Sequence, residues 1–523
     1  MKETLLKSLL TMVCLLGSVS ASAYEFEVDG IFYNDLDPYT CEVTSGEWDS
    51  YTGDIVIPET VKYQGNTLKV VRIGQFAFAS STITSITIPN TVTIIGIGAF
   101  AGCYDLSDVS IPSSVTVIAG YAFENCASLT SITIPNSVTE IGDYAFSGTF
   151  LTSMKIPDSV TSVGHGLFYG DVYLKSVVIG NSLAALSDFM FLDCRGLTDV
   201  TIGSSVTRIN SGAFRQCFSL TNITIPESVT EIESDAFGLC SSLASVTIPN
   251  SVTKIGSYAF QECSSLTDVT IPNSVSKINS YTFYECRNLK SASIPNSVTS
   301  IDDYAFYECN NLAEITIPNS VTTIGRSAFA CCYAFTDLTI PNSVISIGRD
   351  VFSCCYGLTN VTIPNSLTTI SAYAFAACNN LTNVTIPNSV TMVDACAFMD
   401  CTGLTSVTLG NSVSFIDYYA FSGCNSLVSF YSLNPTPSIV KEDNFTDEQY
   451  KNMIVYVPQE ALTAYQSADV WKNFWNLQAI DPAGIKPAKA TDGKAAYYDL
   501  RGYRLTALKR GLNIVDGKKV FIK

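Results

Sequence analysis

The sequence predicts a solenoid built from stacked one-turn coils, and three observations support this fold class. A short motif ending in proline or glycine recurs at one fixed interval along most of the 523-residue chain. Apolar residues occupy fixed positions in the repeat, and one of these positions holds phenylalanine throughout. A coil with one strand and one turn cannot bury an apolar face by itself, whereas stacked coils bury it against each other.

The repeat motif is exemplified by residues 266–272, which read Leu-Thr-Asp-Val-Thr-Ile-Pro. Successive anchors have the spacing of Pro249 and Pro272, except for Pro135 and Pro157, which are one residue closer. A fixed period between about 20 and 50 residues is typical of solenoids. The fifteen anchor residues are Pro89, Pro112, Pro135, Pro157, Gly180, Gly203, Pro226, Pro249, Pro272, Pro295, Pro318, Pro341, Pro364, Pro387 and Gly410.

Each repeat contains two kinds of apolar pattern. Leu266, Val269 and Ile271 alternate with polar residues, which predicts a half-buried strand. In the segment 255–263 the apolar residues are three and four apart, which predicts a short helix or 3₁₀ turn. Gly256 and the Pro-Asn-Ser sequence after the strand predict the two bends.

A phenylalanine ladder is the strictest feature of the repeat. Each buried ring should contribute about 2–3 kcal/mol of transfer free energy, so the repetition specifies a core and not a ligand site. The ladder consists of Phe100, Phe123, Phe146, Phe168, Phe191, Phe214, Phe237, Phe260, Phe283, Phe306, Phe329, Phe352, Phe375, Phe398 and Phe421.

Thirteen of the eighteen cysteines occupy one repeat position, three residues after the phenylalanine. We interpret them as buried thiols, because equivalent side chains of stacked coils point in parallel and the position favours a small apolar residue. Cys331 and Cys354 lie outside this position and are one repeat apart, so a lateral disulfide between these two cysteines is one open alternative. No zinc site is expected, since no CxxC pair occurs and His165 is the only histidine. The ladder cysteines are Cys103, Cys126, Cys194, Cys217, Cys240, Cys263, Cys286, Cys309, Cys332, Cys355, Cys378, Cys401 and Cys424.

The repeat pattern Leu-x-x-Val-Thr-Ile-Pro-x-Ser-Val-Thr-x-Ile-Gly-x-x-Ala-Phe-x-x-Cys resembles the BspA-like class of leucine-rich repeats, found in bacterial and protist surface proteins. The resemblance covers roughly residues 75–428. It implies an α/β solenoid, a right-handed coil with a parallel β-sheet on one flank and short helical or 3₁₀ turns on the other. It also implies adhesion as a candidate function, although a fold alone does not fix function.

Residues 1–23 predict a secretory signal peptide, with Lys2 and Lys7, an apolar run, and Ala21-Ser22-Ala23 at the end. The run is too short to span a bilayer and no later segment is long enough, so a secreted or cell-surface location is expected. The net charge of −18 argues against a nucleic-acid partner, because phosphate binding needs clustered lysine and arginine.

The predicted repeat array, residues 75–432, is flanked by two predicted caps. Residues 24–74 are expected to form an N-terminal β cap, because alternating apolar runs broken by Gly and Asn predict hairpins and an end coil needs a cover. Residues 433–481 predict a C-terminal cap with a strand at 454–458, a helix at 459–466, and Trp471 and Trp475 as packing residues.

Residues 482–523 predict a linker followed by a small β module, in which Asp516-Gly517 indicates a hairpin. This tail is similar to C-terminal β modules of secreted Bacteroidetes proteins. The similarity implies a sorting or surface-attachment role, and a small stabilising hairpin is the alternative.

Tyrosines gather on the predicted turn flank, at positions nine and twelve after the anchor residue. Tyr258, Tyr281, Tyr284, Tyr304 and Tyr307 fall on adjacent coils and are the candidate binding stripe. Packing of each ring on the next coil, with its hydroxyl in water, is the competing interpretation. The outward strand positions carry mostly threonine and lack Tyr, Trp and Arg, so this face is not expected to bind strongly.

No catalytic chemistry is expected from the sequence. A Ser-His-Asp or Cys-His relay has only His165 to use, which lies between two glycines in a less regular stretch between Pro135 and Gly203. No glycine-rich phosphate loop occurs, and acidic pairs such as Asp302-Asp303 lie on predicted turns. We therefore expect neither an enzyme nor a cofactor or metal site.

The sequence thus predicts a secreted or cell-surface protein that binds an extracellular protein or glycan without performing chemistry. The alternative is a structural spacer of the cell envelope with no specific ligand. The ligand and the oligomeric state stay open.

Overall fold

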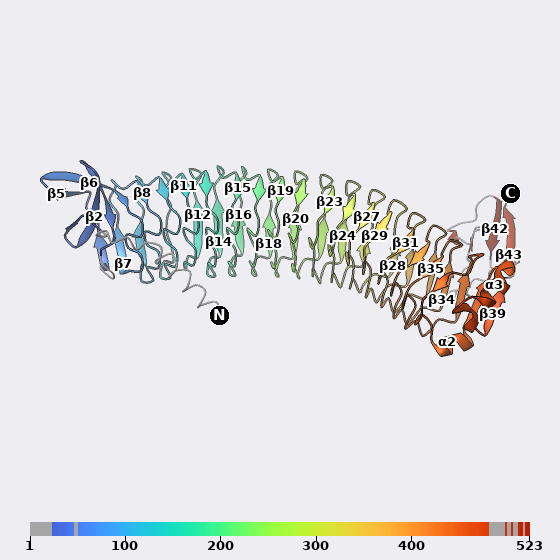
Figure 1. Cartoon of the computed structure of the whole chain (residues 1–523). Helices are drawn as coiled ribbons and strands as arrows, with labels where there is room; N and C mark the ends of the chain where they lie inside the picture. The colour runs from blue at the N-terminus through green and yellow to red at the C-terminus, as the bar shows by residue number, and fades with distance from the viewer. Residues whose placement is uncertain are drawn as a thin grey trace. The chain divides into compact units, whose positions relative to one another are not determined.

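A computed structural model describes residues 24–46 and 51–480, together with four short strands between residues 497 and 522. The described residues form a β-solenoid of about 18 turns with parallel sheets and few helices, which confirms the predicted fold class. Figure 1 shows successive coils side by side, each contributing strands to these sheets. The chain divides into two compact units, residues 1–320 and 321–523.

Most coils contribute two strands where the sequence pattern predicted one. In the first line of strands, β18 (Asn222–Thr224) pairs in parallel with β20 (Ser245–Thr247), so that residues one repeat apart lie opposite each other. In the second line, β19 (Glu231–Ile232) pairs in parallel with β21 (Lys254–Ile255). The pattern assigns Ile255 to the turn segment. Instead it is buried under the second sheet, because alternation over only two residues is too short to recognise as a strand.

In the first unit, the first line of strands consists of β4 (Thr52–Val56), β7 (Thr82–Thr87), β9 (Asp108–Ser110), β12 (Ser153–Ile156), β14 (Ser176–Ile179), β16 (Asp199–Thr201), β18, β20, β22 (Asp268–Thr270), β24 (Ser291–Ser293) and β26 (Glu314–Ile315). The second line consists of β6 (Asn66–Ile73), β8 (Ile94–Ile95), β10 (Val117–Ile118), β11 (Glu140–Ile141), β13 (Ser162–Val163), β15 (Ala185–Leu186), β17 (Arg208–Ile209), β19, β21, β23 (Lys277–Ile278) and β25 (Ser300–Ile301).

In the second unit, the first line of strands consists of β28 (Asp337–Thr339), β30 (Asn360–Thr362), β32 (Asn383–Ile386), β34 (Ser406–Leu409), β36 (Ser429–Ser432), β38 (Ile454–Val457) and β39 (Asn476–Ala479). The second line consists of β27 (Thr323–Ile324), β29 (Ser346–Ile347), β31 (Thr369–Ile370), β33 (Met392–Val393), β35 (Phe415–Ile416) and β37 (Ile439–Val440).

The third side of each coil is a series of tight turns and not a helix. In residues 256–263, N–H groups donate to carbonyls three residues earlier at 3.1–3.3 Å, as in a 3₁₀ turn. Tyr258 and Glu262, at positions nine and thirteen after the anchor, have φ of 62° and 55°, and a left-handed residue interrupts any helix. Positive φ recurs at these two positions from coil to coil.

The phenylalanine ladder lies at the centre of each unit. Its rings are fully buried, and adjacent rings stack with centroids 5.1–6.0 Å apart. The described ladder runs from Phe78 to Phe306 in the first unit and from Phe329 to Phe421 in the second. Phe78 is one rung beyond the predicted set, because an insertion lengthens its coil and places Pro58, the equivalent of Pro89, outside the regular spacing.

The ladder cysteines are buried thiols, as predicted. Their Sγ atoms donate hydrogen bonds to phenylalanine carbonyls of the preceding coil; Cys263 Sγ, for example, lies 3.2 Å from Phe237 O. Burial raises the pKa of Cys240, for example, to about 12. Cysteine therefore recurs at this position because it is small and apolar and has one hydrogen-bond donor. The donor satisfies a carbonyl that has no partner within the turn.

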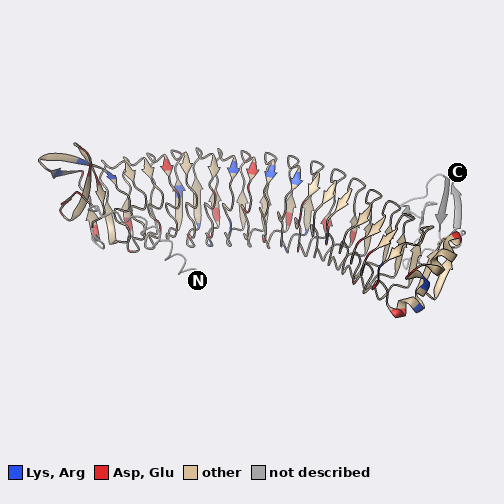
Figure 2. Ribbon diagram, in the orientation of Figure 1, with Lys and Arg blue, Asp and Glu red and all other residues tan. Residues whose placement is uncertain are grey.

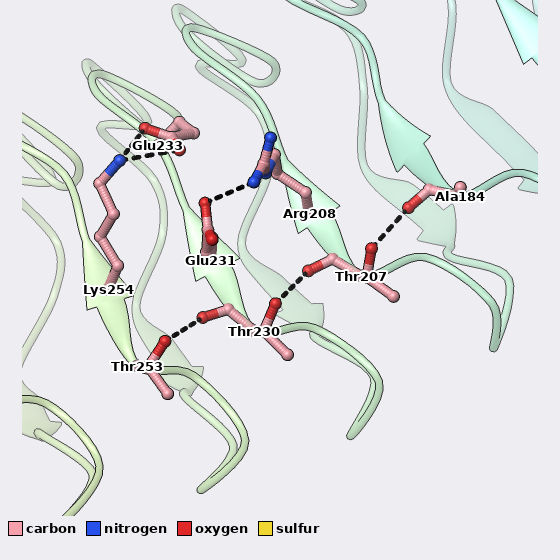
Figure 3. A network of polar contacts seen from close by, with 8 residues as sticks. All are labelled: Ala184, Thr207, Arg208, Thr230, Glu231, Glu233, Thr253 and Lys254. Carbon is pink, nitrogen blue, oxygen red and sulfur yellow. Dashed lines mark hydrogen bonds and ion pairs between the residues drawn. The ribbon is translucent and has the colours of Figure 1, made fainter.

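Hydroxyl side chains join the coils in the same way. Thr253 Oγ1 donates to Thr230 O at 3.2 Å, and Thr230 Oγ1 donates to Thr207 O at 3.1 Å (Figure 3). Two residues earlier, Ser251 Oγ donates to Val229 O at 2.7 Å. The recurrent Ser-Val-Thr sequence thus supplies two bonds to the preceding coil on either side of a core valine.

One pair of coils replaces the cysteine with other residues. Thr149 and Asp171 occupy the position on adjacent coils, and Asp171 accepts hydrogen bonds from Thr149 N at 2.6 Å and Thr149 Oγ1 at 3.1 Å. Asp171 is completely buried, and burial raises the pKa of its carboxyl well above the usual value despite these bonds. The sequence predicts an irregular stretch here, and the structure identifies a buried acid as its main peculiarity.

The N-terminal end is covered by β-hairpins. β1 (Phe26–Val28), β2 (Ile31–Asp37) and β3 (Thr40–Thr44) form an antiparallel meander, and β5 (Thr60–Tyr63) forms a hairpin with β6. Tyr51 packs on Phe78 with ring centroids 4.5 Å apart and so covers the first rung. Within the segment predicted as cap, β4 and β6 already pair in parallel with β7 and β8, so the coil begins there.

The C-terminal end of the second unit is covered by α2 (Asp447–Asn452), η1 (Gln459–Ala461), α3 (Leu462–Ser467) and η2 (Trp471–Asn473). Trp471 is fully buried, and its Nε1 donates to Ser438 O at 2.8 Å, as expected of a packing residue. The same prediction for Trp475 is wrong, because its side chain is 74% exposed. Phe474 faces the core instead, and the next residue points outward as β39 begins.

The C-terminal module contains β40 (Tyr497–Tyr498), β41 (Arg504–Leu505), β42 (Gly511–Val515) and β43 (Lys518–Ile522). β42 and β43 pair in antiparallel register with Val515 opposite Lys518, which confirms the predicted hairpin. The predicted signal peptide, residues 1–23, and most of the predicted linker lie outside the described residues.

Removing one rung of the ladder should be costly. We expect Phe260→Ala to lower the free energy of unfolding by about 3–5 kcal/mol, because the surrounding coils cannot collapse into the cavity. Denaturant unfolding, with hydrogen exchange to locate the loss, measures this effect. Thr270→Ala, at an exposed strand position, is the control and should stay within about 0.5 kcal/mol of the parent. A comparable loss in both variants would contradict the ladder's role.

Asp171 should make stability depend on pH. Since its folded pKa is raised, its contribution is complete below the unfolded pKa of about 3.9 and is lost as the pH rises through the folded pKa. Asp171→Asn should therefore gain stability relative to the parent with increasing pH, as measured by thermal unfolding at several pH values. Asp199→Asn, which removes an exposed carboxylate, controls for net charge. If the midpoint of thermal unfolding changed with pH in the same way for Asp171→Asn and the parent, this expectation would be contradicted.

Candidate functional site

The turn flank is where coils differ from one another. Strand and core positions are nearly invariant along the array, but positions nine and thirteen hold Gly, Ala, Asn, Asp, Glu, Gln, Leu, Ser, Cys, Phe or Tyr. Most side chains at these two positions are at least partly exposed, although Ser327 and Cys396 are buried. A surface that distinguishes one coil from the next is therefore expected along this flank.

The five candidate tyrosines, here called the tyrosine stripe, form two packed rows in the first unit. Tyr258, Tyr281 and Tyr304 stack at position nine with centroids 4.5 and 4.7 Å apart. Tyr284 and Tyr307 stack at position twelve at 5.2 Å. The rows touch each other, since Tyr281 lies 5.4 Å from Tyr284 and Tyr304 lies 5.6 Å from Tyr307. The structure thus brings all five predicted residues together.

Local backbone geometry explains why the two rows meet. Within each coil the N–H of the position-twelve residue donates to the carbonyl of the position-nine residue, at 3.2 Å for Tyr284 and Tyr281. This turn places the two side chains on the same edge of the coil. Tyr258 is 38% exposed and the other four rings are half-buried, so the stripe combines packing with an accessible surface.

Three successive tyrosines at position nine hold the first row away from the backbone. Where position nine of the next coil is glycine, as at Gly166, the preceding aromatic ring occupies the space a Cβ would need; Tyr144 does so there. Tyr281 and Tyr304 carry Cβ atoms, so the ring before each is displaced outward into a stack. The rings stack because position nine of the coils that follow Tyr258 and Tyr281 holds tyrosine and not glycine.

An acidic row runs beside the tyrosines. Glu262, Glu285 and Glu308 occupy position thirteen on the same three coils, and Arg287 binds Glu285 at 2.6 Å and Glu308 at 3.1 Å. Burial, together with the nearby Glu285 carboxylate, raises the pKa of Glu262. Burial and a hydrogen bond to Glu285 raise the pKa of the Tyr284 hydroxyl. Arg287 therefore pairs with two of the three carboxylates, and the surface is acidic as well as aromatic.

Sequence reasoning missed this acidic row, although its signal was present. Tyr-Glu-Cys occurs at 284–286 and 307–309, and Gln-Glu-Cys at 261–263. A glutamate that precedes the ladder cysteine in three consecutive repeats must stack with its equivalents. The pattern was overlooked because position thirteen is not apolar and so was not part of the repeat template.

The strand face is polar, as predicted, with its outward threonines exposed. At the C-terminal end of the second unit, however, Tyr431 and Tyr456 occupy equivalent outward positions on β36 and β38 and stack at 4.6 Å. The expectation that this face lacks tyrosine therefore fails beyond the last repeat. The cap sequence there no longer follows the template from which the face was derived.

The second line of strands carries a row of opposite charges in the first unit (Figure 2). Arg208 binds Glu231 at 2.9 Å and Lys254 binds Glu233 at 2.8 Å (Figure 3). The basic side chains are about half exposed and the carboxylates are partly buried, and ion pairs near the surface contribute about 0–1 kcal/mol. We regard this row as part of a solvated surface, because its charges are already paired.

His165 lies on the turn flank, as expected for a residue between two glycines. Its Nδ1 is 3.3 Å from the Asp188 carboxylate, its N–H donates to Asp143 Oδ1 at 2.7 Å, and its side chain is 58% exposed. A shallow, open depression nearby is lined by Val117, Tyr121 and Glu140, among others. It brings no nucleophile, base and orienting group together, so these residues offer no catalytic arrangement.

Across residues 24–46 and 51–480, no group of three His, Cys, Asp or Glu residues is placed to hold a metal ion. The helices in the same part of the chain are all too short or too polar to cross a membrane.

Comparison with known proteins places this geometry in context. The sequence matches the family of BspA type leucine rich repeat regions over residues 71–198, 184–313 and 299–428, which confirms the resemblance inferred from the repeat. A search of curated protein sequences finds no match.

Several crystal structures of bacterial proteins are similar to this one. A leucine-rich repeat protein from Bacteroides ovatus is 29% identical, with 70% of this chain and 95% of that chain covered and a TM-score of 0.58. A leucine rich cell surface protein from Faecalibacterium prausnitzii is 24% identical, covering 79% and 96%, with a TM-score of 0.34. The pneumococcal vaccine antigen PcpA is 16% identical, covering 88% and 100%, with a TM-score of 0.33.

Proposed function

Because this chain belongs to the BspA-type leucine-rich repeat family, we propose that it is a non-catalytic binding protein of the cell surface or exterior. Its ligand is proposed to be an extracellular protein held by the tyrosine stripe. The observation that carries this proposal is the packing of five tyrosines into two contacting rows beside three glutamates.

Tyrosine suits this role because it offers a large contact area at little cost in side-chain entropy. Aromatic residues are enriched at interface hot spots, whereas Ser and Thr, which cover the strand face, are not. The rings of the stripe are already fixed by their neighbours, so little further ordering is required when a partner binds.

The stacking favours a protein over a glycan. Sugars pack on open ring faces, but the interplanar angles of 8–13° mean that most faces within the rows are covered by the next ring. The edges and hydroxyls remain, and they lie beside Glu262, Glu285 and Glu308. Lysine and arginine side chains pair with such carboxylates and pack against tyrosine, so a basic protein surface is the best match.

A structural spacer is the second candidate, and the same stacking supports it. Rings that pack on one another stabilise adjacent coils whether or not a ligand binds. The proposed location outside the cell depends on residues 1–23 acting as a signal peptide. A sorting or surface-attachment role for the C-terminal module is likewise a proposal, and it rests on the similarity of residues 482–523 to such modules.

The double variant Tyr281→Ser, Tyr304→Ser tests the proposal. We expect binding to a panel of purified extracellular-matrix proteins, measured by surface plasmon resonance, to fall at least about tenfold, because central aromatic residues dominate interface energies. The variant loses four of the ring contacts described above, so the free energy of unfolding should fall by no more than about 6 kcal/mol, at about 0.5–1.5 kcal/mol for each contact. Binding by the parent should also weaken as salt is raised, since the glutamates are only partly buried and salt screens their attraction to a basic partner.

The matched control is Tyr121→Ser, Tyr144→Ser. These residues also stack at position nine, at 5.4 Å, but only one tyrosine lies beside them, Tyr169 at 6.0 Å from Tyr144, in place of a second stacked row. This variant should bind like the parent. If only the control variant loses binding, the ligand is held at the depression beside Tyr121. If the parent binds a glycan array and no protein, the ligand is a sugar. If the parent binds nothing, the structural spacer is favoured.

A further inference from the structure

Two cysteines occupy position thirteen on adjacent coils of the second unit. Cys331 and Cys354 have φ of 62° and 59°, and the N–H of Cys331 donates to Ser353 O at 2.8 Å. Both side chains are partly exposed, whereas the other cysteines of the described residues are buried. These two thiols are therefore the ones that a reagent in solution can reach.

Their spacing suits a disulfide. Neighbouring strands of a sheet lie about 4.8 Å apart, and disulfides join Cα atoms about 4.4–6.8 Å apart. The two thiols are already in hydrogen-bond contact with each other. Ladder thiols have the same coil spacing, but each is buried and donates to a phenylalanine carbonyl. Position thirteen points outward, so rotation of these side chains disturbs no core contact.

The two sulfurs are chemically unequal. A hydrogen bond from Cys331, supported by Ser353 and Tyr356 and opposed by burial, lowers the pKa of Cys354 to about 6. Ser353 Oγ lies 3.6 Å from Cys354 Sγ. The thiolate is the nucleophile in thiol–disulfide exchange, so Cys354 is suited to attack first and Cys331 to react second.

We propose that Cys331 and Cys354 form a dithiol site that reacts with small disulfides and closes into a covalent bridge between adjacent coils. Cys354 Sγ attacks one sulfur of the small disulfide, whose S–S bond breaks; one thiolate leaves and a mixed disulfide forms. Cys331 then releases its proton to water and attacks Cys354 Sγ, and the second thiolate leaves. The protein loses two electrons and two protons, and the small disulfide is reduced to two thiols.

The bridge has a structural consequence. It closes a loop of one repeat and joins two coils that otherwise depend on ring stacking and hydrogen bonds. The midpoint of thermal unfolding of the oxidised protein should be a few degrees above that of the reduced protein. The dithiol site shares no residue with the tyrosine stripe, so the test of this site does not depend on the proposed binding function.

The experiment uses the full-length protein, fully reduced and then exposed to glutathione disulfide at pH 7. After acid quenching, alkylation and chymotrypsin digestion, mass spectrometry follows the peptides Ala330–Tyr333 and Ser353–Tyr356. In the parent these peptides should become linked. Cys331→Ser should stop at a glutathione adduct on Cys354, and Cys354→Ser should react at least about tenfold more slowly. The buried ladder thiols in other peptides are internal controls and should stay reduced.

Three results would overturn the proposal. The first is that the two parent peptides stay unlinked although both become alkylated. The second is that the peptides still become linked in both serine variants, through Cys332 and Cys355. The third is that Cys354→Ser reacts with glutathione disulfide as fast as Cys331→Ser does. Thermal unfolding of each reduced variant checks that it is folded. Should a variant fail that check, the linkage in the parent alone decides the outcome.

Discussion

Stacking of the buried phenylalanines from coil to coil is the interaction on which the rest of the structure depends. A single coil has one ring and a few aliphatic side chains, too little to offset the entropy of ordering its backbone. Its stability comes from the faces that neighbouring coils cover, as in any solenoid. The only partner that fits at every step is the equivalent residue of the next coil, which is why the sequence repeats so strictly.

The same constraint explains the polar parts of the repeat. A backbone that turns several times within one short repeat leaves carbonyls that no strand satisfies, and buried carbonyls without partners are costly. Cys263, Ser251 and Thr253 each donate to a carbonyl of the preceding coil. The cysteines that look like a disulfide framework, and the serine and threonine of the recurrent Ser-Val-Thr sequence, are therefore hydrogen-bond donors between coils.

Variation is left to the turn flank, and both sites proposed here are found there. The tyrosine stripe uses positions nine and twelve and the paired cysteines use position thirteen; positions nine and thirteen are the two with positive φ. Since their side chains point outward, substitutions there do not disturb the ladder. Non-glycine residues in the left-handed region cost about 1 kcal/mol or more each, and the stacked coils stabilise them.

The sequence by itself determined the repeat, its period, the core ladder, the buried thiols and the membership of the stripe, because each depends only on which residues recur at a fixed interval. Cap elements such as the strand at Ile454 and the hairpin around Asp516-Gly517 were also predictable from local patterns. Only the tertiary structure decided what depends on backbone direction. It placed Ile255 in a second sheet, formed 3₁₀-type turns with left-handed residues where a short helix or 3₁₀ turn was expected, exposed Trp475, and buried Asp171 beside Thr149. It also set Glu285 beside the tyrosines and Cys331 against Cys354, since neighbours across coils are chosen by register and φ and not by apolar pattern.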